Sequence, residues 1–350
     1  MSLTVIYPRM AGGCPRLDGV LTRALTNVPH RIADDMEQLG DLRGQRLLFA
    51  VPVGEFGINP AYQQLLLALR KDTARLAGCT AGLIVDGESE LYTKSAATEL
   101  TLAANQAGCA FVGRPLVEGT GSLANFRVQA DTLSCSLPEA YRTAAAELVQ
   151  RVLSYAPAKK ERPELLVLHA SSHHISNTLD LWNEVVDRLG DRCTITEIGL
   201  RNGTVFDCSG CPYTMCLHFG EQGGCFYGSV MQDEVYPAVR RADAIVMVCP
   251  NYNDAISANL TAFVNRLTAL FRQSRFYDKA LFGIVVSGYS GGDIVARQLI
   301  GGLNMNKSFH LPGNFALIET ANAPGDALHL PGIEERLDAF AQTILNTLCR

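Results

Sequence analysis

The stretch 242-ADAIVMVCPNYNDAISANLTAFVNRL-267 carries the clearest structural pattern in the chain. It contains an apolar run, Ala244 to Pro250, of the length that is typical of a buried strand. A polar loop follows, and residues 258–271 then place apolar side chains on one stripe at helical spacing. Buried strands that alternate with amphipathic helices form a parallel sheet covered by helices on both faces. The stretch therefore predicts an α/β fold.

Comparable apolar runs occur along the whole chain of 350 residues. They lie at 3–8, 47–52, 81–87 and 115–118 in the N-terminal half and at 165–170, 244–250, 281–288 and 315–319 in the C-terminal half. Their spacing repeats, because Gly87 and Glu118 are 31 positions apart, as are Gly288 and Glu319. Two unrelated open α/β domains could share this rhythm, but we interpret it as a tandem duplication.

The duplication divides the chain into two domains of ordinary size. The expected fold class is α/β, with doubly wound parallel-sheet domains at 1–155 and 156–350 in tandem. A polar, proline-containing segment, 156-APAKKERPE-164, is the predicted linker. The second domain has polar loops suited to a ligand and a cysteine-rich insertion, whereas the first lacks both. We expect the first domain to be a degenerate copy.

Bulk composition excludes several classes of partner. Hydrophobic residues make up 47% and charged residues 19%, which is typical of a soluble globular protein. The formal net charge of -5 provides no basic field for nucleic acid or for anionic lipid. No apolar run approaches the roughly 18 residues that a membrane span needs. We expect a cytoplasmic protein that binds neither nucleic acid nor membrane.

Three polar loops of the second domain follow predicted strands, where ligands bind in open α/β sheets. They are 171-SSHHISNT-178, 250-PNYNDAIS-257 and 287-SGYSGGD-293. The first combines hydroxyls with a helix start and suits a monophosphate, although a simple helix cap is the alternative. The other two each offer a tyrosine and exposed backbone, which suit a flat heterocycle. Together the loops predict a nucleotide-like ligand.

In combination, these loops and the stretch 242–267 resemble the flavodoxin-like NAD(P)H-dependent FMN reductases, over roughly residues 164–325. The resemblance implies a flavodoxin-like fold, noncovalent FMN, NAD(P)H as reductant and a small-molecule or protein electron acceptor. Tyr252, Asp254 and Tyr289 would contact the flavin ring and the substrate. The residues that the resemblance assigns to FMN are Ser171, Ser172, His173, Ser176, Asn177, Thr178, Pro250, Asn251, Tyr252, Asn253, Ala255, Ser287, Gly288, Tyr289, Gly291 and Gly292.

Two departures from the family pattern stand out. His173 and His174 occupy the place where the family often has Arg or Lys with small residues, and Asn253-Asp254 replaces a glycine-containing ring loop. The Asp254 carboxylate could serve a substrate, but we expect it to cap the following helix. Because the family usually builds its flavin pocket at a homodimer interface, the first domain could replace the partner subunit. The loops 52–60 and 86–94 would then line the pocket, with Glu55, Glu88, Glu90, Tyr92 and Lys94 as their polar groups.

A cysteine segment, 207-DCSGCPYTMCLHFGEQGGC-225, is inserted in the second domain only. Its candidate metal ligands are Cys208, Cys211, Cys216 and Cys225. Four thiolates could hold a [4Fe-4S] cluster, as in the iron-sulfur flavoproteins that this segment resembles, or zinc, or no metal at all. We expect the segment to lie beside the flavin loops.

The predicted function is FMN-dependent NAD(P)H oxidoreduction of a flavin, a quinone or another small molecule, through hydride transfer. One alternative is an electron-transfer protein that holds FMN and a [4Fe-4S] cluster. Another is a binding module that has lost its flavin. The sequence leaves open the electron acceptor, the choice between NADH and NADPH, and the oligomeric state.

Overall fold

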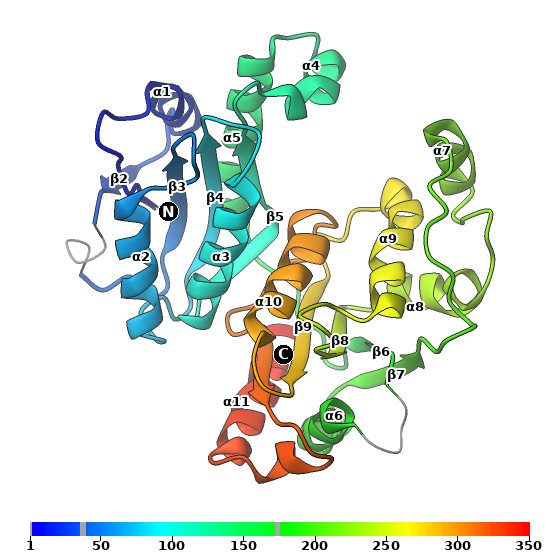
Figure 1. Ribbon diagram of the computed structural model, residues 1–350. Helices are drawn as coiled ribbons and strands as arrows, with labels where there is room; N and C mark the ends of the chain where they lie inside the picture. The colour runs from blue at the N-terminus through cyan, green and yellow to red at the C-terminus, as the bar shows by residue number, and fades with distance from the viewer. Residues whose placement is uncertain (1, 36–39, 172–175) are drawn as a thin grey trace. The chain divides into compact units, whose positions relative to one another are not determined.

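The computed structural model describes residues 2–35, 40–171 and 176–350, and it divides into two compact units, Met1–Ala156 and Pro157–Arg350. Each unit contains one five-stranded sheet in which every pair of neighbouring strands is parallel (Figure 1). The strands are joined by helices, as the sequence pattern predicts. The predicted α/β class with two parallel sheets is therefore confirmed.

Unit 1 has the strand order β2-β1-β3-β4-β5. Its strands are β1 (Leu3–Ile6), β2 (His30–Ala33), β3 (Arg46–Val53), β4 (Thr80–Gly87) and β5 (Ala110–Gly119). Its helices are α1 (Pro15–Ala24), α2 (Pro60–Lys71), α3 (Thr93–Gln106), α4 (Arg127–Leu133) and α5 (Leu137–Ser154). Helices α1 and α5 pack on one face of the sheet around Leu48, Ala50 and Val149.

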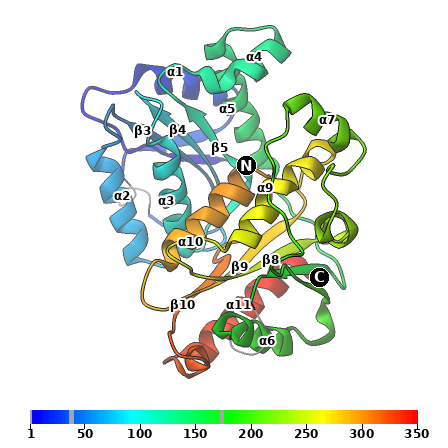
Figure 2. The same ribbon diagram turned by 45° about the vertical axis from the view of Figure 1, so that its right-hand side comes forward.

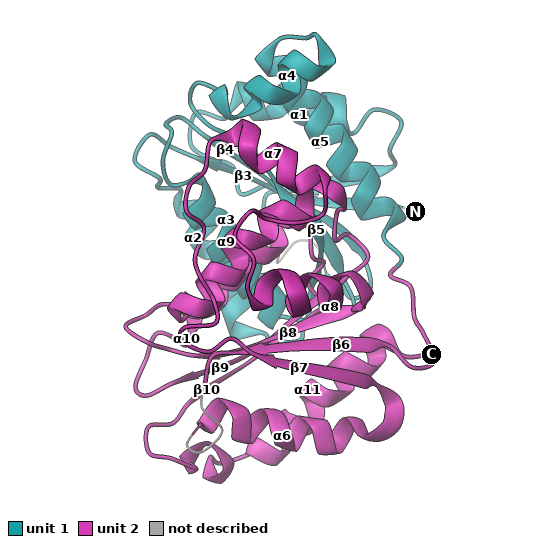
Figure 3. Cartoon of the chain, turned by 90° about the vertical axis from the view of Figure 1, so that its right-hand side faces the viewer, with its two compact units in different colours: residues 1–156 teal, residues 157–350 magenta. Residues whose placement is uncertain are grey.

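Unit 2 repeats this order as β7-β6-β8-β9-β10. Its strands are β6 (Glu164–His169), β7 (Thr194–Gly199), β8 (Ala244–Pro250), β9 (Ala280–Ser287) and β10 (Ala316–Thr320). Its helices are α6 (Asn177–Leu189), α7 (Tyr213–Glu221), α8 (Tyr236–Arg241), α9 (Ala258–Gln273), α10 (Gly292–Leu299) and α11 (Ile333–Leu348). Figure 3 shows α6 and α11 on one face of the sheet and α8, α9 and α10 on the other.

Short helical turns complete both units. They are 3-10 turns at Ala124–Phe126, Gly190–Arg192 and Asp326–His329, and π-helical turns at Met231–Val235 and Ile300–Met305.

The order 2-1-3-4-5 in both sheets is that of flavodoxin-like folds. Sheet order reverses between the first and third strands, so a ligand is expected at the carboxyl ends of β6 and β8 in unit 2. The same order in two consecutive units is what a tandem duplication would produce. The central strands of unit 2, β6, β8 and β9, are buried apolar runs, such as β8 with Ile245, Val246 and Met247 at 0% exposure, so they fix the loops at the sheet's edge.

Candidate functional site

The first loop of unit 2 connects β6 to α6. Ser172 and His173, both expected to bind FMN, lie outside the described residues. Ser176 is the N-cap of α6: its hydroxyl accepts from the Leu179 N–H at 3.3 Å and lies 2.9 Å from the Thr178 hydroxyl. The Ser171 hydroxyl is buried and has no hydrogen-bond partner within the described part of the chain. The loop thus offers one uncommitted hydroxyl beside a capped helix start.

The Asn177 side chain is bonded within unit 2. Its side-chain amide donates to the Ala323 carbonyl at 2.9 Å, and its side-chain oxygen accepts from the Ala327 N–H at 3.3 Å. Asn177 therefore fastens the first loop to the segment that follows β10. This fourth segment was missed in the sequence, and the residues 321-ANAPGD-326 after a predicted strand were the only signal for it.

The second loop contains a tight turn at residues 252–255. The Tyr252 N–H donates to the Ala255 carbonyl at 3.3 Å, and the Ala255 N–H donates back at 3.2 Å. Asn253 and Asp254 have φ of 54° and 57°, the left-handed conformation that a type I′ turn requires at both central positions. Asn and Asp tolerate this conformation, which explains how the loop dispenses with glycine.

The expectation that Asp254 caps the following helix is wrong. Helix α9 begins at Ala258, and its N-cap is Ser257. The Asp254 carboxylate instead accepts from the Asn251 side-chain amide at 3.3 Å. Because Asp254 lies in the turn at residues 252–255, its carboxylate is part of the second loop and not of the start of α9.

Asn251 joins the second loop to the third. Its side-chain N–H groups donate to the Ser287 hydroxyl at 3.1 Å and to the Ser290 carbonyl at 2.8 Å. Its side-chain oxygen is buried and, among the described residues, has no hydrogen-bond partner. Gly291 has φ of 85°, and a Cβ added there would lie 2.0 Å from the Asp254 carboxylate. Glycine at this position therefore lets the two loops approach each other.

The remaining third-loop residues lie around the same edge of the sheet. Tyr289 is 82% exposed, and its hydroxyl accepts from the Asn322 side chain at 3.0 Å. Tyr252, at 57% exposure, is the second exposed ring. A Cβ at Gly288 would lie 3.0 Å from the Asn322 side-chain oxygen, and one at Gly292 would lie 2.6 Å from Ile318. Pro250 and Ala255 are half-buried beside these groups.

The four cysteines of the insertion line one small cavity of about 60 Å³. Met215, Phe219 and Phe226 also line it, so its wall is largely apolar. Cys208 is exposed, and the other three thiols are half-buried. Among the described residues no group of three Cys, His, Asp or Glu side chains is arranged to hold a metal ion.

The insertion packs along α9, as the positions of α7 and α9 in Figures 1 and 2 show. The Asp207 carboxylate accepts from Asn265 at 2.9 Å, and the Arg272 guanidinium donates to the Tyr213 hydroxyl at 3.2 Å. Asn265 and Arg272 lie 7 and 14 residues beyond Ala258. At about 1.5 Å per residue they are about 10 and 21 Å along the helix from the ring loop. The expectation that the cysteines lie beside the flavin loops stays a prediction.

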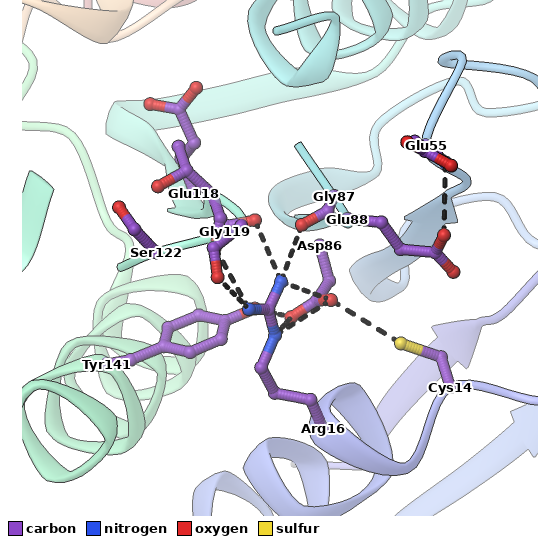
Figure 4. A network of polar contacts seen from close by, with 12 residues as sticks. Cys14, Arg16, Glu55, Asp86, Gly87, Glu88, Glu118, Gly119, Ser122 and Tyr141 are labelled. Atoms are coloured by element: carbon purple, nitrogen blue, oxygen red, sulfur yellow. Dashed lines mark hydrogen bonds and ion pairs between the residues drawn. The ribbon is translucent and has the colours of Figure 1, made fainter. Parts of the chain in front are cut away.

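In unit 1, a polar network occupies the corresponding edge of the sheet (Figure 4). The Arg16 guanidinium forms an ion pair with the buried Asp86 carboxylate at 2.9 Å. It also donates to the carbonyls of Gly87 at 2.6 Å and Thr120 at 2.9 Å. The Tyr141 hydroxyl donates to the same carboxylate at 2.9 Å.

Burial dominates the acid-base behaviour of this network. It raises the pKa of the Cys14 thiol to about 11, with the Asp86 charge as a second cause, and it raises the pKa of Tyr141 well above its usual range. Both groups therefore stay protonated at neutral pH and act as donors to the carboxylate. The Arg16 guanidinium is a cation near the start of α1, where the helix dipole favours an anion. The Asp86 carboxylate holds it there.

The polar groups expected on the edge loops of unit 1 mostly bond within the unit. The Glu88 carboxylate accepts from the Glu55 N–H at 3.1 Å, the Glu90 carboxylate accepts from the Ser122 N–H at 2.7 Å, and Lys94 lies 3.8 Å from Glu118. These loops also expose four large, mainly apolar side chains: Phe56, Ile58, Leu91 and Tyr92.

The described part of the chain contains no helix with the length and apolar character of a bilayer span. No curated protein matches the sequence. Two similar solved structures are an NAD(P)H:quinone oxidoreductase from Methanothermobacter marburgensis and an FMN-dependent NADH-azoreductase from Bacillus anthracis in complex with FMN. The first is 16% identical, with a TM-score of 0.39, over 53% of this chain and 96% of that one. The second is 13% identical, with a TM-score of 0.34, over 52% and 99%.

Residues 163–323 match the family model of NADPH-dependent FMN reductases. The matched segment runs from the start of β6 to the segment after β10, so it contains all three polar loops. Residues 163–323 of unit 2 are therefore similar to the NADPH-dependent FMN reductase family, and this match indicates an FMN-dependent NAD(P)H oxidoreductase.

Proposed function

We propose that unit 2 binds one FMN at the carboxyl ends of β6, β8 and β9 and uses NAD(P)H to reduce a small-molecule acceptor such as a quinone or a free flavin. The observation that carries the proposal is a set of uncommitted polar atoms at this edge. The Ser171 hydroxyl, the Asn251 side-chain oxygen and the Ser257 hydroxyl are all buried, and none has a partner among the described residues. Buried polar atoms without partners are rare in native proteins, so a polar ligand is the natural partner for this set.

The residues fit FMN in chemical type. A hydroxyl next to a capped helix start suits the phosphate. Exposed tyrosines on two adjoining loops suit the edge and face of a flat ring system. When bound, FMN supplies the capacity to accept a hydride from NAD(P)H and pass the two electrons on. The overall reaction with a quinone is NAD(P)H + H⁺ + quinone → NAD(P)⁺ + hydroquinone.

The chain's own task in this chemistry is to bind and orient. Asn251 fixes the distance between the second and third loops through Ser287 and Ser290. The type I′ turn holds the Asp254 carboxylate in the second loop. We propose that the carboxylate lies close to the electron-accepting substrate there. Tyr252 and Tyr289 would form the exposed wall of the site.

Purified protein tests this proposal. We expect a flavin spectrum, one FMN per chain after denaturation, and NAD(P)H oxidation that depends on an added quinone. Ser171→Ala should weaken FMN binding because the hydroxyl would contact the phosphate, whereas Ser209→Ala, in the cysteine insertion, should not. Colourless protein that takes up no FMN on soaking would contradict the proposal and favour a binding module.

We also propose that unit 1 binds no flavin and takes the place of a second subunit. The Arg16 network supports the first part, because a guanidinium already occupies the edge of the sheet where a ligand would lie. A chain that is monomeric in solution and carries one FMN is expected. Two FMN per chain, or activity that requires a dimer, would contradict it.

The second candidate is an electron-transfer protein with a [4Fe-4S] cluster on Cys208, Cys211, Cys216 and Cys225. One observation favours it: the four thiols line a single cavity. Among the described residues no three of these side chains are arranged to hold a metal ion. Iron and sulfide analysis of anaerobically purified protein distinguishes a cluster from metal-free thiols, since a cluster requires both elements in amounts of about four per chain.

A further inference from the structure

The second loop of unit 2 presents a carboxylate that the third loop helps to hold in place. The Oδ1 atom of Asp254 accepts from the Asn251 side-chain amide at 3.3 Å, and a Cβ added at Gly291 would lie 2.0 Å from the same atom. Oδ1 therefore faces the third loop. Oδ2 accepts no hydrogen bond from any residue in the described part of the chain, so it is the oxygen left for a ligand.

Gln298, on α10, fixes the backbone of the same turn. Its side-chain N–H donates to the Asp254 carbonyl oxygen at 3.0 Å, and its side-chain oxygen accepts from the Ile256 N–H at 2.9 Å. A carbonyl oxygen only accepts and an N–H only donates, so these two partners fix the orientation of the amide. Together with the reciprocal bonds between Tyr252 and Ala255, they hold the turn in one conformation before a ligand binds.

The charge of the Asp254 carboxylate is not balanced by its surroundings. The second and third loops contain two carboxylates, Asp254 and Asp293, and no Lys, Arg or His. Asp293 forms an ion pair with Arg297 at 3.0 Å. Asp254 forms no ion pair with any residue that the structure describes. One uncompensated negative charge therefore lies in a turn that is otherwise neutral.

We propose that Asp254 selects electron acceptors by charge, favouring cationic acceptors and disfavouring anionic ones, and that Gln298 is its positioning residue. Tyr252 lies in the same turn, and Tyr289 lies two residues before Gly291, so an acceptor ring that contacts these exposed tyrosines would lie near the carboxylate. The carboxylate would attract a cationic substituent and repel an anionic one, and repulsion contributes to specificity as attraction does. This inference rests on the proposed function, because it names the class of acceptor for that same site.

The first measurement uses the full-length chain loaded with FMN, without NAD(P)H. Three naphthoquinones that share one ring system and carry an uncharged, a trimethylammonium or a sulfonate substituent are titrated, and each Kd is measured from the change in flavin absorbance. We expect the anionic quinone to bind on the order of tenfold more weakly than the cationic one, the scale of exposed charge pairs. This ratio should fall toward one as the salt concentration rises from about 0.01 M to about 1 M.

Asp254→Asn removes the charge and keeps a residue that tolerates the left-handed conformation, so the turn should persist. The ratio of the two Kd values should lose most of its tenfold difference, and the Kd for the uncharged quinone should not change. Asp233→Asn, which makes the same change at an exposed position of unit 2, should alter neither. Equal binding of the cationic and anionic quinones by the unmodified chain, or a ratio that persists in Asp254→Asn, would overturn the inference. If the chain takes up no FMN, or if no naphthoquinone perturbs the flavin, the proposed function fails, and the inference with it.

Gln298→Met tests the positioning role. Loss of both side-chain hydrogen bonds should speed amide exchange of Ile256 in the chain without ligand. It should also reduce the ratio of the two Kd values, because the carboxylate is no longer held at one place. Faster exchange with an unchanged ratio would overturn the role of Gln298 as a positioning residue.

Discussion

Replacing Gly291 by alanine should destabilise unit 2 much more than replacing Gly325, a glycine of the same unit with nearly the same backbone conformation. Gly291 has φ and ψ of 85° and 8°, and Gly325 has 83° and -11°. In Gly325→Ala the new Cβ would have no atom within 4 Å, so only the left-handed backbone is penalised, by about 1–2 kcal/mol. In Gly291→Ala the Cβ would lie 2.0 Å from the Asp254 carboxylate and 2.9 Å from the Asn251 amide. Relief of this overlap breaks their hydrogen bond and adds about 1–3 kcal/mol.

The chain's single tryptophan makes the measurement selective, because Trp182 is fully buried in the core of unit 2. Urea unfolding of the full chain, followed by Trp182 fluorescence, should give a total loss of about 2–5 kcal/mol for Gly291→Ala, by the same additive reasoning. FMN should also bind more weakly. In an Asp254→Ala background the 2.0 Å overlap disappears and only the 2.9 Å approach to the Asn251 amide remains, so Gly291→Ala should cost little more than the backbone penalty. Equal losses for the two glycine variants, or no relief by Asp254→Ala, would refute the reasoning.

Three further predictions concern polar groups away from this turn. Arg16→Met should destabilise β4 locally by about 3 kcal/mol, since the buried Asp86 loses its ion pair. Amide-exchange protection of β4 should fall about a hundredfold. As the control, adding Asp86→Asn to Arg16→Met should restore part of this protection. Arg266→Met should speed protease cleavage within 206–229, because the buried guanidinium donates to the Gly228 carbonyl and the Ser229 hydroxyl at 3.0 Å, and should leave FMN affinity unchanged. Burial lowers the pKa of His310 to about 4. The unfolded chain therefore binds more protons than the folded chain between pH 6.5 and 4, and the free energy of unfolding falls by about 3 kcal/mol as pH falls through that window. The urea midpoint of His310→Gln should lack this part of the pH dependence.

The sheets and the ligand edge follow from local pattern. Runs such as 244-AIVMVCP-250 are apolar throughout because the strand is buried on both faces, and the loops that follow such runs lie at one edge by topology. The family match over 163–323 agrees with what those loops predict. The polar character of the second and third loops could therefore be interpreted before their positions were known.

The details that were missed depend on contacts between distant residues. Asn177 bonds to atoms of Ala323 and Ala327, about 150 positions away in the chain, which no local pattern indicates. The place of the cysteines depends on which residues of α9 hold the insertion, and spacing between cysteines carries no such information. The turn at Asn253 is different: two consecutive residues that tolerate the left-handed conformation were a usable signal for a type I′ turn.

The Arg16–Asp86 pair has a consequence for how unit 1 could change over evolutionary time. Removal of Arg16 alone would leave a buried carboxylate facing the vacated edge, and that carboxylate would repel a phosphate as well as destabilise the fold. Removal of Asp86 alone would leave an unpaired guanidinium among carbonyl groups. A ligand could return only after both residues had been replaced, through an intermediate that is less stable than either end point. If unit 1 is a degenerate copy, as we propose, the pair makes the loss of its ligand hard to reverse.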